Sequence, residues 1–255
     1  MRAATYHGQN DIRVEDVTAE SVGAEEVRID VDSCGICGSD LHEYTAGPIF
    51  VPEGEPHPVS GEVAPIRMGH EYSGTLGAVG EDVTGLAVGD AVAVNPILYC
   101  GACRQCREGN YHICDSIGFI GLSGGNGGFA ESAVVNAEHA VPLGDDVPLE
   151  YGALVEPLSV ALHAVHRSGL QAGDTVAVFG SGPIGLAVIQ CARVAGAGTI
   201  FVSEPRAARR ERAADCGAAE LIDPSTTDPV EYIHSQTDGG ADVTFEVAGV
   251  EPSFN

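Results

Sequence analysis

The stretch that decides the fold is TVAVFGSGPIGLAVIQCARVAGAGTIFVSE, residues 175–204. The apolar run TVAVF (175–179) predicts a strand that leads into the loop GSGPIG (180–185), and an apolar helix is expected from Pro183. A second strand, TIFVS (199–203), follows. A strand, a glycine-rich turn, a helix and a strand in this order are typical of a parallel, doubly wound sheet.

The same alternation continues beyond this stretch. A helix is expected through RAARRERAADCG (206–217), followed by the strand ELID (220–223), another helix and the strand DVTFEV (242–247). Residues 158–255 thus hold about four strands, whereas two complete mononucleotide-binding halves would have six. We expect an incomplete Rossmann-type domain in a chain that is truncated at its C-terminal end.

The first 157 residues have a different pattern, in which short alternating strands such as EVRIDVD (26–32) lie between turn residues. The regular spacing of these strands predicts a partly open β-barrel. Five prolines between Thr45 and Arg67 indicate a long structured loop, and such loops are often functional. A helix that starts at Glu156-Pro157, with proline at its first position, is expected to lead into the second domain.

The loop GSGPIG supplies the candidate cofactor contacts, Gly180, Gly182, Pro183, Ile184 and Gly185. A lone GxGxxG is a weak signal, because a glycine-rich turn often serves backbone geometry alone. Here it follows a strand and opens a helix, where backbone N–H groups and the helix N-terminus can face a pyrophosphate. This context favours a bound dinucleotide.

Glu204 ends the second strand, 19 residues beyond Gly185, where a carboxylate can bind the ribose hydroxyls. A carboxylate there repels a 2′-phosphate, so NAD is favoured over NADP. Binding of NADP stays an alternative because of Arg206, Arg209 and Arg210, since arginine can pair with a 2′-phosphate. The ordinary interpretation of these arginines is a solvated helix face. We expect NAD on the strength of the acidic residue.

Four cysteines in the segment CGACRQCREGNYHIC have the spacing C-x2-C-x2-C-x7-C: Cys100, Cys103, Cys106 and Cys114. Four thiolates in one loop can close a tetrahedral structural zinc site, whereas an oxidising compartment would favour two disulfides. The opening stretch MRAATYHGQNDIRVEDV has no apolar region typical of a secretory signal. We therefore expect a structural zinc in a cytoplasmic protein.

A second candidate metal set is dispersed along the chain and consists of Cys37, His70, Glu71 and Glu156. One thiolate, one imidazole and one or two carboxylates leave a coordination position for water or substrate, as in a catalytic zinc site. Each residue also has an ordinary interpretation, as a buried thiol, a core histidine or an acid favoured by a helix dipole. Spacing alone leaves both interpretations open.

The order of these motifs is similar to that in zinc-dependent medium-chain alcohol and polyol dehydrogenases. The shared motifs are the four-cysteine loop, GSGPIG, GICGSDLHEY (35–44), GHEYSG (69–74) and LVEPLSVALHAV (154–165). The chain resembles this family over essentially its whole length. Within the family, the loop from Glu43 to Gly74 looks most like that of the (R,R)-2,3-butanediol dehydrogenases.

The resemblance implies an α/β protein with a GroES-like catalytic domain (1–157) and an NAD-binding Rossmann domain (158–255). It implies two zinc ions per chain, of which the structural one is held by the four clustered cysteines. The catalytic zinc would be bound by Cys37, His70 and either Glu71 or Glu156, and which of the two carboxylates binds varies with the state of the enzyme.

Further site residues are implied in the same way. Ser39 and His42 match the hydroxyl and the imidazole that carry the alcohol proton to solvent. Asp40 matches a partner of the zinc-binding histidine, and Arg209 matches a residue near the adenosine ribose. These roles come from the resemblance and not from the spacing of the residues.

The implied activity is reversible, NAD-linked oxidation of a secondary alcohol or a vicinal diol such as 2,3-butanediol. Sorbitol-like polyol dehydrogenases and L-threonine dehydrogenases share the site plan and remain alternatives, as does a non-catalytic zinc- and nucleotide-binding remnant. Chains of the family run further and form homo-oligomers, so the activity and the assembly of these 255 residues stay open.

The charge balance is extreme, with 37 acidic against 12 basic side chains and a net charge of −25. All 12 basic residues are arginine, and the chain contains no lysine. Such a surface repels nucleic acid and anionic membranes, which leaves a small molecule as the expected partner. No apolar run approaches the ~20 residues of a membrane helix. We expect adaptation to a salt-rich interior, while an ordinary acidic mesophile protein would not explain the missing lysine.

The charge predicts a salt-dependent stability. Repulsion among the carboxylates destabilises the folded chain in dilute buffer, and molar KCl shortens the Debye length to about 3 Å. Screening that restores about 3 kcal/mol would raise the melting temperature by roughly 10 °C for a chain of this size. Thermal unfolding across a KCl series measures the effect, and a flat response would exclude halophilic adaptation.

Overall fold

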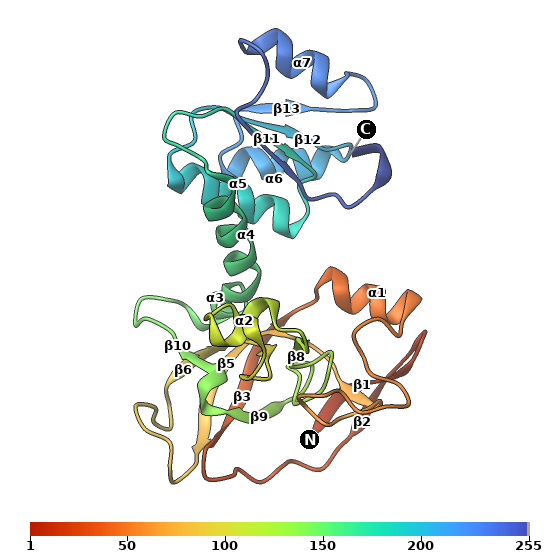
Figure 1. The fold of residues 1–255 in the computed structure, drawn as a ribbon, viewed down its shortest axis with the longest axis vertical. Coiled ribbons are helices and arrows are strands. Elements are labelled where there is room, and N and C mark those ends of the chain that lie inside the picture. Colours follow the sequence, from red (N-terminus) through yellow and green to blue (C-terminus); the bar gives the residue numbers. More distant parts are fainter. Residues whose placement is uncertain (254–255) are drawn as a thin grey trace. The chain divides into compact units, whose positions relative to one another are not determined.

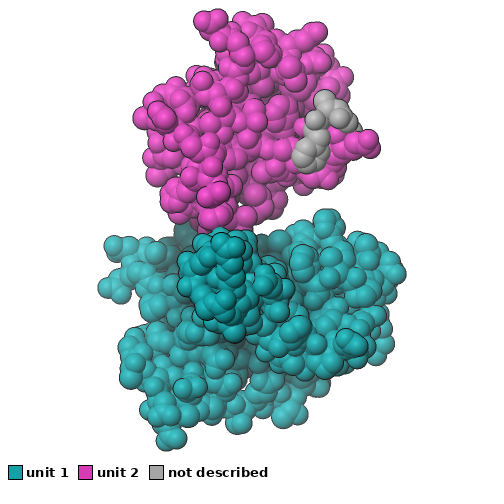
Figure 2. All heavy atoms as spheres, in the orientation of Figure 1, with its two compact units in different colours: residues 1–156 teal, residues 157–255 magenta. Residues whose placement is uncertain are grey.

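The computed structural model describes residues 1–253, so residues 254 and 255, which end the predicted second domain, lie outside the described part of the chain. Two compact units are present, residues 1–156 and residues 157–255 (Figures 1 and 2). The sequence prediction placed the boundary one residue later, after Pro157. Each unit has its own buried apolar core.

Two antiparallel sheets form the framework of the first unit (Figure 1). The smaller has the order β2-β1-β4, with bounds Asp11–Asp16, Arg2–Gly8 and Ile66–Arg67. The larger has the order β10-β6-β5-β3-β9, with bounds Ala140–Pro142, Ala91–Val94, Glu71–Val79, Glu26–Gly35 and Ser132–Asn136. Backbone hydrogen bonds from Ala4 to Phe129 (2.7 Å) and from Glu131 to Arg2 (3.1 Å) join β1 of the smaller sheet to the segment that leads into β9 of the larger one. The expected barrel-like β architecture is confirmed.

The apolar residues that alternate in EVRIDVD (26–32) contribute to the core of this unit. Val27 and Ile29 of β3 are fully buried, Arg28 between them is half-buried, and Asp30, which follows Ile29, is exposed. Val27 and Ile29 pack against Tyr72 and Leu76 of β5. Burying each such side chain stabilises the fold by about 1.5–3 kcal/mol, so strand register is fixed by the apolar face.

Short elements complete the first unit. The two-stranded pair β7-β8 (Ile97–Leu98, Gly118–Phe119) flanks the four-cysteine loop, which also contains α2 (Arg104–Arg107) and the 3-10 turn Tyr111–Ile113. The unit also contains the helices α1 (Gly38–Ala46) and α3 (Leu149–Gly152) and the 3-10 turn Ala137–His139. The proline-rich segment between α1 and β4 contains no helix or strand.

Helix α4 (Val155–Ser168) begins two residues before Pro157. The prediction that this proline is the first helical residue is therefore wrong, since it is the third. The first-turn N–H groups of a helix have no partner within the helix, so a proline costs no hydrogen bond at either position.

The second unit is the predicted parallel sheet with helices between its strands (Figure 1). The strand order is β13-β12-β11-β14, with bounds Glu220–Ile222, Ile200–Ser203, Val176–Phe179 and Val243–Glu246. The connecting helices are α5 (Pro183–Ala195), α6 (Ala207–Cys216) and α7 (Pro229–Gln236), and a 3-10 turn (Glu251–Ser253) follows β14. Val176 and Val178 pack against Val188 and Ile189 of α5. All four predicted strands and their order along the chain are confirmed.

Among the described residues, no helix combines the length and the apolar character that a bilayer crossing requires.

Candidate metal centres and cofactor site

The four clustered cysteines bring their sulfur atoms together. The Sγ–Sγ distances are 3.5 Å for Cys103–Cys106, 3.9 Å for Cys103–Cys114 and 3.5 Å for Cys114–Cys100. A tetrahedron with Zn–S bonds of about 2.3 Å has edges of about 3.8 Å, whereas a disulfide has an S–S distance of about 2.05 Å. All eight cysteines are free thiols, so the donor set fits zinc and not the disulfide alternative.

Backbone N–H groups point at these sulfurs. Cys103 caps the short helix α2, and its sulfur accepts the N–H of Cys106 at 3.5 Å. N–H groups of Asp115 and Cys106 lower the pKa of Cys103 to about 6, whereas desolvation and the neighbouring thiols raise that of Cys106 to about 12. Thiolates this close repel one another, and a bound dication is what allows all of them to ionise.

A second donor set gathers at the end of β3 and the start of β5. Gly35 pairs with Glu71 in the antiparallel ladder, which places Cys37, two residues further on, beside His70 and Glu71. One ligand atom of each of these three side chains lies within 4.8 Å of the others. A Cβ at Gly35 would come 2.2 Å from Glu71 Oε2, so only glycine leaves room for that carboxylate.

His70 is oriented by Asp40. Their Nδ1 and Oδ1 atoms lie 3.4 Å apart, both side chains are almost fully buried, and neither atom has a hydrogen-bond partner elsewhere among the described residues. Burial alone would lower the pKa of His70, but the interactions with Asp40 and Cys37 outweigh it and raise the pKa to about 10. A carboxylate on Nδ1 leaves Nε2 for a metal, the arrangement common to zinc-binding histidines.

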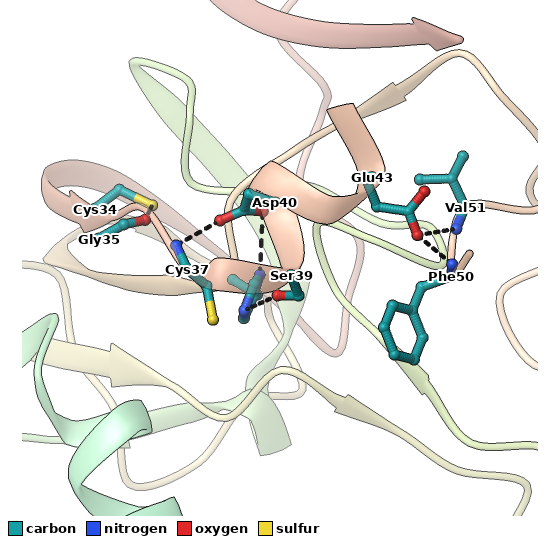
Figure 3. Close-up of polar contacts among 9 residues, drawn as sticks. Cys34, Gly35, Cys37, Ser39, Asp40, Glu43, Phe50 and Val51 are labelled. Atoms are coloured by element: carbon teal, nitrogen blue, oxygen red, sulfur yellow. Dashed lines mark hydrogen bonds and ion pairs between the residues drawn. The ribbon is translucent and has the colours of Figure 1, made fainter. Parts of the chain in front are cut away.

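Helix α1 positions the other predicted residues of this site (Figure 3). Cys37 is its N-cap residue and donates its backbone N–H to Asp40 Oδ2 at 2.8 Å. Ser39 is half-buried, and its Oγ lies 3.2 Å from His70 Nε2. His42 is exposed, one turn further along the same helix. The structure therefore brings Cys37, Ser39 and His70 together and leaves His42 at the surface.

Glu156 is not part of the three-residue donor set. It is half-buried, and this partial burial is the main reason why its pKa is raised. The positive charge of His70 acts in the opposite direction, and the charges of Glu71 and Asp40 raise the pKa further. Glu156 thus lies near the site, but the arrangement favours Glu71 as the carboxylate among the ligands. The assignment of Glu71 or Glu156 as a zinc ligand stays a prediction.

The glycine-rich loop of the second unit has the geometry that a dinucleotide needs. Gly180 follows β11 with φ +98°, and Gly182 is the N-cap residue of α5 without a side-chain cap, so the first N–H groups of the helix are free for a ligand. A Cβ at Gly185 would lie 2.2 Å from the carbonyl oxygen of Gly180. Pro183 and Ile184, at the start of α5, belong to the same turn.

Glu204 follows β12 and is 3% exposed. Its carboxylate accepts the backbone N–H groups of Ser181 and Arg206, each at 3.0 Å. Arg210 is engaged elsewhere, because it pairs with Asp223 at 3.0 Å and bonds the carbonyl of Glu204. Of the three predicted arginines, Arg209 alone has its guanidinium near the Glu204 carboxylate, at 3.8 Å. Ser181, a buried partner of Glu204, was missed in the sequence because serine in such a turn carries no distinctive signal.

Two family models match the chain. Residues 23–145 match the alcohol dehydrogenase GroES-like domain, and residues 183–255 match the zinc-binding dehydrogenase domain. The (R,R)-butanediol dehydrogenase of Bacillus subtilis is 48% identical over 251 residues, which is 98% of this chain and 71% of that protein. Sorbitol dehydrogenase of B. subtilis (38% identity, 98% and 69%) and L-threonine 3-dehydrogenase of Caldanaerobacter subterraneus (39% identity, 89% and 63%) are more distant.

Solved structures agree with this grouping. The crystal structure of 2R,3R-butanediol dehydrogenase from B. subtilis superposes with a TM-score of 0.93 at 47% identity, over 99% of this chain and 72% of that one. A zinc-binding dehydrogenase structure from Sinorhizobium meliloti, with NADP bound, has a TM-score of 0.91 at 34% identity, over 100% and 71%.

The two donor sets predict different consequences of ligand loss. Cys103→Ser should lower thermal stability, because a structural zinc contributes on the order of 10 kcal/mol to local folding. His70→Ala should keep the melting temperature within a few degrees while lowering the zinc content from two ions to one. Metal analysis of both purified variants tests this, and a single zinc per chain in the folded, unsubstituted protein would contradict the two-site assignment.

Glu204 predicts the cofactor preference. Glu204→Gln removes the charge but keeps the side-chain size, so NAD should bind about tenfold to hundredfold more weakly, as expected for a charged hydrogen bond of about 1.5–3 kcal/mol. NADP should bind more tightly than before, because the repulsion of its 2′-phosphate is gone. Fluorescence titration of both cofactors measures the change, with Glu211→Gln on exposed α6 as the control. Tighter binding of NADP than NAD by the unsubstituted protein would contradict the role of Glu204.

Proposed function

The chain belongs to the zinc-binding alcohol dehydrogenase family, and we propose that it transfers a hydride between NAD and a vicinal diol of the 2,3-butanediol type, with acetoin as the oxidised partner. The observation that carries the proposal is the set Cys37, His70 and Glu71, whose ligand atoms lie within 4.8 Å of one another. Three such ligands leave one zinc position for a substrate oxygen. The diol rests on the likeness to a butanediol dehydrogenase.

The protein's own residues prepare the alcohol for oxidation. Zinc held by this set would supply a Lewis acid that favours loss of the hydroxyl proton, and NAD would supply the hydride acceptor. Asp40 holds the imidazole of His70 in one orientation through Nδ1. Ser39, at 3.2 Å from His70 Nε2, offers a hydroxyl that takes the substrate proton and passes on its own. His42, exposed on the next turn of α1, releases that proton to solvent.

A vicinal diol has a second oxygen that needs a polar partner. Glu156 supports this choice of substrate, because its side chain is half-buried and its carboxyl is close enough to interact electrostatically with His70 and Glu71. A half-buried carboxyl that is not among the metal ligands can hydrogen-bond the neighbouring hydroxyl or carbonyl. A simple secondary alcohol would not form this hydrogen bond, which is worth about 0.5–1.5 kcal/mol.

For the working medium we propose a salt-rich cytoplasm. The net charge of −25 and the absence of lysine support it. Arginine carries the remaining positive charge, and several of these side chains pair with carboxylates, as Arg2 does with Glu131 and Arg13 with Asp11. Twelve cations can neutralise only a minority of 37 acids, so the rest depend on screening by solvent ions.

A substrate panel tests the proposed activity. NADH formation by the zinc-loaded protein in molar KCl should be fastest, as kcat/KM, with (R,R)-2,3-butanediol, and acetoin should be reduced in the reverse direction. Sorbitol and L-threonine should be poorer by at least about tenfold, or about 1.4 kcal/mol, because the longer polar chain of sorbitol and the charged groups of L-threonine replace the apolar methyl groups of 2,3-butanediol. A higher kcat/KM for either would favour that alternative, and turnover of none would favour a non-catalytic protein that binds zinc and nucleotide.

A further inference from the structure

Helix α1, which carries Cys37 at its N-cap, is not held by an apolar face. Its two buried side chains are carboxylates, Asp40 (3% exposed) and Glu43 (0% exposed), whereas Leu41 and Tyr44 are exposed. A surface helix ordinarily docks through a stripe of apolar residues. Residues three apart lie on one face of a helix, so both carboxylates point into the unit from the same side of α1.

Glu43 is bound by the backbone of the proline-rich segment that follows the helix (Figure 3). Its two oxygens accept the N–H of Ile49 at 3.1 and 3.0 Å, and Oε1 also accepts the N–H of Val51 at 3.2 Å and that of Phe50. A fully buried carboxylate without donors would be strongly destabilising, and three N–H groups offset that cost. The same bonds satisfy three backbone donors in a segment without a helix or strand.

The segment 49–51 is itself fixed to the first unit. Val51 is buried and packs in a cluster with Tyr6, Ile66 and Met68. The ring of Phe50 contacts that of Phe119 edge to face, with centroids 5.8 Å apart. Glu43 therefore connects α1 to an anchored part of the core, one turn beyond the point where Asp40 connects it to His70.

We infer that Glu43 is a positioning residue for the metal set of Cys37, His70 and Glu71. It has no contact with that set, and it acts by holding the C-terminal half of α1, so that the N-terminal end keeps Cys37 and Ser39 beside His70. The inference deepens the proposed function, but its main readouts do not depend on turnover.

The test compares Glu43→Gln with Glu55→Gln in the full chain. The amide of glutamine presents an NH2 group to the N–H donors and loses acceptor positions, while Glu55 lies exposed in the same segment and is the matched control. Zinc removal by a chromophoric chelator is followed together with hydrogen exchange of residues 49–51. We expect Glu43→Gln to release one zinc at about tenfold lower chelator concentration and to exchange these amides at least about tenfold faster.

The four-cysteine zinc is the internal reference, because it lies in another loop and should be released as in the unsubstituted protein. Faster exchange of residues 49–51 with unchanged release of both zinc ions would show that Glu43 only fixes the segment, and would overturn the inference. Equal weakening of both zinc sites would indicate a general loss of stability and would overturn it as well. If Glu43→Gln does not fold, Glu43→Asp, which keeps the charge but shortens the reach, must show the same selective loss.

Turnover separates this inference from the proposed function. With zinc at saturation, Glu43→Gln should lower kcat for the diol about tenfold and leave KM for NAD within about twofold, because the second unit is untouched. Selective loss of one zinc in a protein that turns over no diol would support the positioning role and contradict the proposed function. Unchanged kcat together with unchanged zinc release would remove the positioning role alone.

Discussion

The candidate metal site depends on two buried carboxylates that fix one short helix. Asp40 binds the N–H of Cys37 at 2.8 Å and faces His70 at 3.4 Å, and Glu43 binds the backbone of residues 49–51. Buried charges tolerate little displacement, because each lost hydrogen bond leaves an unpaired charge in a medium of low dielectric. The geometry of the sulfur, nitrogen and oxygen donors is therefore set by electrostatic contacts and not by apolar packing of the helix.

In the second unit, too, a buried carboxylate is held by backbone N–H groups, at the nucleotide-binding edge of the sheet. Glu204 is buried, and the N–H groups of Ser181 and Arg206 fix its carboxylate at the end of β12. Because β11 and β12 are parallel neighbours, their carboxyl ends place the glycine-rich turn and Glu204 side by side. The guanidinium of Arg209 lies 3.8 Å from this carboxylate.

Local patterns in the sequence were sufficient to predict the order of strands and helices in the second unit and the closing of the four-cysteine loop. Periodicity and spacing report on neighbours along the chain, so these features are readable. Other features depend on partners far apart in sequence. His70 meets Asp40, 30 residues away, and only the family resemblance implied this pair. Arg210 pairs with Asp223 and not with the Glu204 carboxylate, and Glu43 gave no signal because its partners are backbone amides. The start of α4 was misplaced because proline is accepted throughout a first helical turn.

One chain thus brings together two donor sets of different chemistry, each of which can hold a zinc ion. X-ray absorption at the zinc edge distinguishes the two sites, since Zn–S bonds of about 2.3 Å and Zn–N or Zn–O bonds of about 2.0–2.1 Å are resolved. Four sulfurs at one site and one at the other predict a mean of about 2.5 sulfurs per zinc, with nitrogen and oxygen supplying the remainder. Sulfur ligation alone in a protein that holds two zinc ions would contradict the mixed site of Cys37, His70 and Glu71.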